Sequence, residues 1–147
     1  MKKCILLLFL IIFASKNFAQ KRELGNVTIE ELAQKSNPKD TAAVATMLFN
    51  KGKTYFEYSQ EDGFYILTDV EVKLKIYKKE GYSWANFEVP FYIGDNVRES
   101  VSFSKAITYN LVDGKIEKTK LKSENEFSED KNKLWASKKI VMPAVKE

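Results

Sequence analysis

The sequence predicts a mainly β protein, either an antiparallel β-sandwich or an open, curved sheet of about six or seven strands. Residues 101–121 alternate around Asp113-Gly114, and Asp-Gly is a strong signal for a two-residue type I′ hairpin. Residues 70–77 alternate apolar and polar side chains without a break, which is typical of a strand with one face toward water. Turn signals recur at intervals of roughly 8–14 residues, the spacing of an all-β fold.

Residues 1–19 have the layout of a secretory signal peptide. The chain begins Met-Lys-Lys, an uncharged apolar run follows as far as Ala14, and the small residue Ala19 precedes the expected cleavage site. The apolar run is shorter than the about 20 residues that a membrane span requires. We therefore expect an exported protein, periplasmic or secreted, without a membrane span after cleavage.

Removal of residues 1–19 changes both the charge and the reactive side chains. Three of the 24 basic residues lie in this segment and none of the 20 acidic ones does, so the formal net charge falls from +4 to +1. A near-neutral exported chain gives no basis for nucleic-acid binding. The segment also holds the single cysteine, Cys4, and the chain has no histidine. Disulfides, Cys/His metal sites, cysteine nucleophiles and a histidine base are thereby excluded from the mature chain, and we expect no cofactor.

Residues 20–41 are expected to be a polar lead-in that contains one short helix. The sequence Thr28-Ile29-Glu30-Glu31 fits a capping box. In this motif the Thr28 hydroxyl accepts a hydrogen bond from the backbone N–H of Glu31, whose side chain reaches back to the N–H of Thr28. The helix is expected to continue to about Gln34.

Residues 42–147 are expected to form the β-rich domain. Strands are predicted over residues 42–50, 53–58, 64–77, 82–92 and 134–142 and over both arms of the 101–121 hairpin, with a turn at 60–63 and a charged loop or short helix at 122–133. Val70, Val72, Leu74 and Ile76 are expected to face the core, and Glu71, Lys73 and Lys75 to face water. Pro90 suits an edge or the end of a strand.

A two-residue turn in the hairpin pairs Leu111 with Ile116. The same register places Leu121 on the opposite face from this pair. We therefore expect a bulge or a change of packing partner near Lys118.

Two motifs bear on catalysis and metal binding. Ser102 and Lys105 match the Ser-x-x-Lys nucleophile motif, which works on a helix, where positions three apart share a face. In a strand the same spacing places the two side chains on opposite faces, so we expect ordinary strand positions. Acidic residues cluster over 124–130, but their spacing is not that of an EF-hand and no glycine supplies its turn, so a solvated loop is expected. The sequence therefore predicts a protein that is not an enzyme.

Aromatic residues are concentrated in residues 82–92. Tyr82, Trp84 and Tyr92 could form an exposed platform that stacks on the sugar rings of a cell-envelope glycan or peptidoglycan. Aromatic residues at this spacing also serve as core or cross-strand pairs, and that interpretation stays open. Trp84 and Tyr82 lie next to the turn at Gly81 and are the rings that we expect to be exposed.

Several segments, taken in order, resemble a known family. They are residues 51–56, 75–82, 99–106, 108–116 and 142–147. Each is similar to the N-terminal domain of unknown function found ahead of a transglutaminase-like domain in exported Bacteroidetes proteins. The resemblance covers nearly the whole mature chain.

The resemblance implies a β-sandwich and a non-catalytic role. In that family the Cys-His-Asp triad belongs to a later, papain-like domain, and no residue of this chain matches it. The resemblance therefore implies a module that positions or shields a linked or associated transglutaminase-like domain. Family members continue past Val145-Lys146-Glu147 with a glycine and further strands, so we expect the β domain to be C-terminally incomplete. The alternative is a glycan- or peptidoglycan-binding module that uses exposed aromatic residues.

Overall fold

Seven strands in three antiparallel sheets make up the computed structural model, which describes residues 24–95 and 98–147. The signal peptide predicted over residues 1–19 lies outside the described residues. Strands β1 and β2 form one sheet, β4 and β5 a second, and the third has the order β3–β7–β6. The predicted mainly β, antiparallel class is therefore confirmed.

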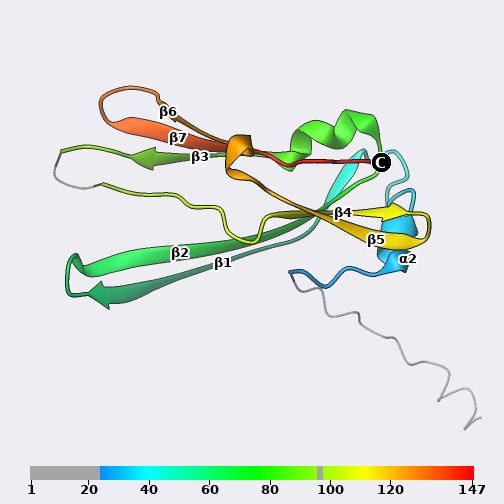
Figure 1. The fold of residues 1–147 in the computed structure, drawn as a ribbon, viewed down its shortest axis with the longest axis horizontal. Helices are drawn as coiled ribbons and strands as arrows, with labels where there is room; N and C mark the ends of the chain where they lie inside the picture. The colour runs from blue at the N-terminus through cyan, green and yellow to red at the C-terminus, as the bar shows by residue number, and fades with distance from the viewer. Residues whose placement is uncertain (1–23, 96–97) are drawn as a thin grey trace, which may run out of the picture.

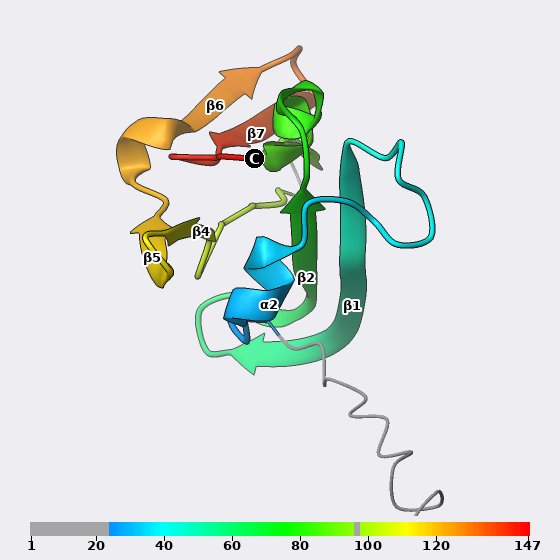
Figure 2. The ribbon, with the colours of Figure 1, turned by 90° about the vertical axis from the view of Figure 1, so that its right-hand side faces the viewer.

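The elements lie in two layers joined at one end. The helical segments are α2 (Ile29–Ala33), η1 (Lys79–Ala85) and η2 (Ser123–Asn125), and the strands are β1 (Ala45–Ser59), β2 (Gly63–Ile76), β3 (Asn86–Tyr92), β4 (Ile107–Val112), β5 (Lys115–Lys120), β6 (Glu126–Asp130) and β7 (Trp135–Val141). The β3–β7–β6 sheet lies above the long β1–β2 ribbon, and the β4–β5 hairpin lies near one end of it (Figure 1). Figure 2 shows α2 between the β4–β5 hairpin and the ribbon.

Strands β1 and β2 form one continuous ribbon. The sequence predicted two strands, 42–50 and 53–58, with a break at Gly52; this was wrong, because Gly52 pairs with Val70 inside the ladder. Glycine is tolerated here because the position is exposed and needs no side chain for packing. The register runs from Ala45↔Ile76 to Ser59↔Gly63 and shifts once, between Met47 and Phe49. The predicted turn after Ser59 is confirmed.

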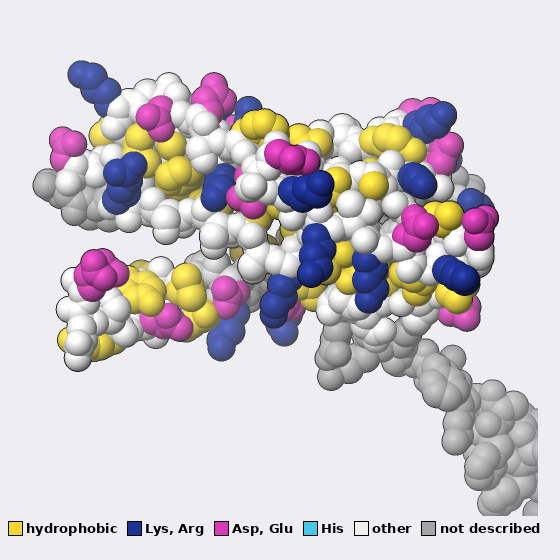
Figure 3. Space-filling view, in the orientation of Figure 1, with side chains coloured by type: hydrophobic (Ala, Val, Ile, Leu, Met, Phe, Trp, Pro, Cys, Tyr) yellow, Lys and Arg dark blue, Asp and Glu magenta, His cyan; other side chains and the backbone are white. Residues whose placement is uncertain are grey.

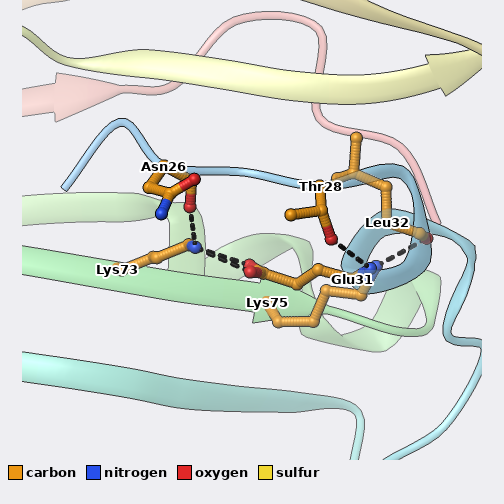
Figure 4. A network of polar contacts seen from close by, with 6 residues as sticks. All are labelled: Asn26, Thr28, Glu31, Leu32, Lys73 and Lys75. Carbon is orange, nitrogen blue, oxygen red and sulfur yellow. Dashed lines mark hydrogen bonds and ion pairs between the residues drawn. The ribbon is translucent and has the colours of Figure 1, made fainter. Parts of the chain in front are cut away.

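Helix α2 covers part of the ribbon that was expected to face water (Figure 4). Thr28 Oγ1 accepts a hydrogen bond from Glu31 N at 3.2 Å, as the capping box predicts. The Glu31 carboxylate contacts Lys73 Nζ at 2.7 Å, and Lys73 Nζ also donates to the carbonyl of Asn26. Lys75 Nζ donates to the carbonyl of Leu32, and burial lowers its pKa. The prediction that Lys73 and Lys75 face water was therefore wrong, because each ammonium binds a backbone carbonyl of the N-terminal segment.

The predicted hairpin is present in a shorter form. Asp113 and Gly114 both have positive φ, at 49° and 73°, as a type I′ turn requires. Leu111 pairs with Ile116 as predicted. The register is continuous from Ile107↔Lys120 to the turn, so the bulge expected near Lys118 does not form. Residues 101–106 lie outside the strand.

The remaining segments differ from the prediction at two places. Residues 82–85 belong to η1 instead of the start of a strand. Within the segment 122–133, expected to be a loop or short helix, residues 123–125 form the short helix η2 but residues 126–130 form β6. Strand β6 lacks apolar alternation, with Phe127 its single apolar residue, so its sequence pattern does not predict a strand. The strand predicted over 134–142 is confirmed as β7, and Pro90 lies on β3, an edge strand of its sheet, as expected.

The core of the described residues is small and consists of side chains from η1, β7 and the residue that follows β2. Its buried apolar side chains are Tyr77, Ala85, Ala136 and Ile140. Asn110 is also buried, and its Nδ2 donates to the carbonyl of Ala144 at 2.7 Å. The far half of the β1–β2 ribbon, residues 51–71, contributes no buried residue to this core.

Candidate functional site

The far half of the ribbon, residues 51–71, which we call the arm, carries one face without any charged side chain. Figure 3 shows the arm separated from the β3–β7–β6 layer by an open notch. Side chains of directly paired residues share a face, so the register places together Gly52, Thr54, Phe56, Tyr58, Phe64, Ile66, Thr68 and Val70, which we call the arm face. Phe56 and Phe64 are 76% and 79% exposed, and Tyr58, Ile66 and Val70 are at least 60% exposed. The chain therefore presents an uncovered apolar surface.

The opposite face of the arm is polar and internally bonded. Tyr55 Oη donates to Asp69 Oδ2, and Tyr65 Oη donates to Glu57 Oε2, both at 2.8 Å. The hydrogen bond to Asp69 is the main cause that raises the pKa of Tyr55 to about 12. Lys53 Nζ lies 4.7 Å from the centre of the Tyr55 ring. These contacts join polar groups across the two strands of the arm.

The three aromatic residues proposed for glycan binding do not form one platform. Trp84 lies in η1 and is 55% exposed, whereas Tyr82 in the same helix is half-buried. Tyr92 lies at the other end of β3, a strand of seven residues, so roughly 20 Å of strand separates it from η1. The structure therefore brings Tyr82 and Trp84 into one element and places Tyr92 elsewhere.

Tyr92 instead has a partner that the sequence did not indicate, Trp135. The two residues are paired between β3 and β7, and their ring centres are 5.7 Å apart with planes at 79°. Trp135 is 45% exposed. Cross-strand register is the only signal that joins these positions, and it depends on which strands pair.

Four charged residues beside this aromatic pair form a closed set of ion pairs, which we call the charge square. Lys131 Nζ lies 2.5 Å from Glu129 and 3.5 Å from Glu88, and Lys139 Nζ lies 3.5 Å and 3.4 Å from the same two carboxylates. The hydrogen bond and charge of Lys131, with the charge of Lys139, hold the pKa of Glu129 below its ordinary value. The square contains two positive and two negative charges, so its net charge is zero.

The motifs considered for catalysis and metal binding lie apart from one another, in the segment before β4 and in residues 124–130. Ser102 and Lys105 lie in an irregular segment before β4, not in a strand as expected. Within the acidic cluster, Glu126 pairs with Lys138, and Glu129 belongs to the charge square. The described residues hold no group of three or more His, Cys, Asp or Glu arranged for a metal ion. Across residues 24–95 and 98–147, no helix has the length and apolar character needed to cross a membrane.

Comparisons with known proteins add no relative. No protein-family model matches the chain, and neither the curated proteins nor the solved structures contain a match.

Proposed function

We propose that this chain is a non-catalytic, exported β module that positions or shields a transglutaminase-like domain, either linked to it or bound as a separate protein. One observation carries the proposal, the uncovered apolar face of the arm. Five of its side chains are at least 60% exposed in the chain as described. Protein-binding surfaces are one of the features that an exposed apolar patch of this kind marks.

The size of the arm face suits a protein partner. A fully buried aromatic side chain covers about 150–250 Å². At the exposed fractions given above, the three aromatic rings together with Ile66 and Val70 present an accessible area of roughly 600 Å². Two partners that each bury this area give about 1,200 Å² in total, the lower bound for a stable, specific interface. The absence of charge on the arm face favours an apolar surface of a folded domain over a charged polymer.

The resemblance drawn from residues 51–56 and the later segments supplies the identity of that partner. In the proposed arrangement the arm lies against the transglutaminase-like domain, and the catalytic triad belongs to that domain. The module holds this domain in the periplasm or outside the cell. It needs neither a cofactor nor nucleic acid for this role.

The first experiment measures the mass of the native polypeptide in the cell envelope by immunoblot with an antibody against residues 101–121. A band far above 16.9 kDa indicates a linked domain, and a band near the mature mass indicates a separate partner. In the linked case, calorimetry follows unfolding of the native polypeptide. In the separate case, the tagged chain is used to capture the transglutaminase-like protein of the same organism.

The arm face is then tested by Phe56→Ser combined with Phe64→Ser. The matched control, Lys53→Ser with Glu71→Ser, changes the opposite face of the same ribbon. We expect the arm-face variant alone to split a single unfolding transition into two, or to abolish capture. If both variants behave like the unaltered protein, the docking role is wrong. Acyl-transfer or hydrolytic turnover by this chain alone, lost through a point change within it, would refute the non-catalytic role.

Glycan or peptidoglycan binding is the second candidate function. Of the three residues first proposed for glycan binding, Trp84 is exposed as that function requires. Tyr82 is half-buried and Tyr92 packs against Trp135, so the original set of three rings does not support it as a unit.

A further inference from the structure

We propose that one face of the β3–β7–β6 sheet binds a neutral oligosaccharide, which stacks on Trp135 and takes hydrogen bonds from the charge square. This site is independent of the arm face and of the docking role proposed for it. It also differs from the three-ring platform that the sequence suggested.

Strand register defines this face. Side chains of directly paired residues lie on the same side of the sheet. One side therefore carries Glu88, Pro90 and Tyr92 of β3, Trp135, Ser137 and Lys139 of β7, and Phe127 and Glu129 of β6. Lys131 joins them, because its backbone N–H donates to the carbonyl of Trp135 and its side chain belongs to the charge square. We call this set the mixed face. Its exposed rings lie at two corners, with the charge square between them.

The aromatic corner is held rigidly. Trp135 N and Leu134 N both donate to Asn132 Oδ1, which fixes the backbone at the start of β7. Tyr92 packs so closely over Gly94 that a Cβ there would lie 2.2 Å from the Tyr92 hydroxyl oxygen. Because the planes of Tyr92 and Trp135 meet at 79°, the two rings form a corner rather than a flat stack. A rigid aromatic corner loses little conformational entropy when a ligand binds.

The chemistry of the mixed face selects the ligand. The apolar C–H face of a sugar ring packs on an indole, while its hydroxyls need donors and acceptors beside the ring. The charge square supplies both kinds of group, since carboxylates accept and ammonium groups donate charge-assisted hydrogen bonds. Its zero net charge offers no long-range attraction to a polyanion, so a neutral glycan fits better than an acidic one.

A shallow depression extends the site along the sheet. Its lining includes Glu88 and Lys139 of the mixed face, their neighbours Asn86, Phe87 and Val141, and the core residue Ile140. Phe127 pairs with Lys139 and is 52% exposed, so a second ring lies beside this depression. The combination of Trp135, the charge square and this depression indicates a site for several sugar units rather than for one.

The chain has only two tryptophans, which makes the test direct. Nitrogen-15 labelled full chain is titrated with β-1,4-linked hexamers of N-acetylglucosamine and of glucose, while the two indole N–H signals are followed by NMR. Trp84→Phe assigns the signals. We expect the Trp135 signal to shift and the Trp84 signal to stay in place with at least one hexamer. The acidic hexamer hexagalacturonate is expected to bind more weakly.

Variants then locate the binding energy. Trp135→Ala is expected to weaken binding at least roughly tenfold, the effect of removing a central aromatic anchor. Trp84→Ala is the matched control, because it removes an exposed tryptophan outside the mixed face and should leave affinity unchanged. Glu129→Gln should weaken binding without removing a ring. If neither neutral hexamer shifts Trp135, or if Trp84 alone responds, the proposal is wrong; the labelled wild-type protein decides this even if Trp135→Ala fails to fold.

Discussion

The base and the arm of the β1–β2 ribbon share one ladder but differ in what covers them. At the base, Lys73 and Lys75 are tied to the segment around α2, and Tyr77, next after β2, is buried. Along the arm, Phe56, Phe64 and Ile66 stand in solvent. The ladder runs through both halves, with its one register shift in the base, between Met47 and Phe49. The comparison teaches that alternation decides which side chains share a face, whereas the rest of the fold decides whether that face is covered.

The largest expected effect on stability comes from replacing Lys73, which lies in the covered half of the ribbon. Lys73→Met retains the apolar stem but leaves the half-buried Glu31 carboxylate and the Asn26 carbonyl without their cation. We expect the free energy of unfolding to fall by about 1–3 kcal/mol, measured by urea denaturation. The same change at Lys51 on the arm, which is exposed, should stay within about 0.5 kcal/mol.

A double variant sharpens this result. Glu31→Gln together with Lys73→Met removes both charges, so no uncompensated carboxylate remains. It should be more stable than Lys73→Met alone. If it is less stable, the ion pair is not what fixes α2 on the base.

A smaller difference is expected between apolar side chains of the two halves. Leu74→Ala at the half-buried base should cost about 1–2 kcal/mol, less than the full range for a core leucine because the site is partly exposed. Ile66→Ala on the arm, where the side chain is 63% exposed, should cost less than about 0.5 kcal/mol in the isolated chain. Equal losses in thermal or urea unfolding would show that the arm face is covered in solution.

The smallest effect concerns the polar face of the arm. The pKa of Tyr55 is raised from 10.0 to about 12 through its hydrogen bond to Asp69. Because the folded-state pKa is the higher one, the stabilisation is complete below pH 10.0 and is lost as pH rises toward about 12. Ultraviolet titration of phenolate should show a late phase that Tyr55→Phe removes and Asp69→Asn shifts to lower pH. A late phase that persists in Tyr55→Phe would assign it to another tyrosine, such as Tyr65.

Local sequence signals predicted much of the fold. Thr28, Asp113-Gly114 and the alternation over 70–77 each act through neighbouring residues, and the cap, the turn and the strand are present. Strand β6 could not be predicted in the same way, because its charged residues are stabilised by ion pairs with Lys131, Lys138 and Lys139. Those pairs exist only once β6 lies beside β7.

The candidate site was less predictable than the fold. Trp84 was correctly expected to be exposed, because it lies beside the turn at Gly81. Trp135 was missed, since its link to Tyr92 depends on pairing between strands that lie more than 40 residues apart in sequence. Likewise, the contacts of Lys73 with Glu31 and Asn26 join positions more than 40 residues apart, so the alternation around Lys73 could not indicate them.

The ribbon has a consequence for the solution behaviour of the protein. Among the described residues neither β1 nor β2 pairs with a third strand, so both edges offer unpaired backbone groups to strands of other molecules. The charged polar face opposes the addition of such strands. In a growing fibre, the Lys51, Lys53 and Glu57 side chains of successive molecules would be brought together and removed from water. These charges therefore act as gatekeepers against amyloid-like assembly, a role that requires no binding partner.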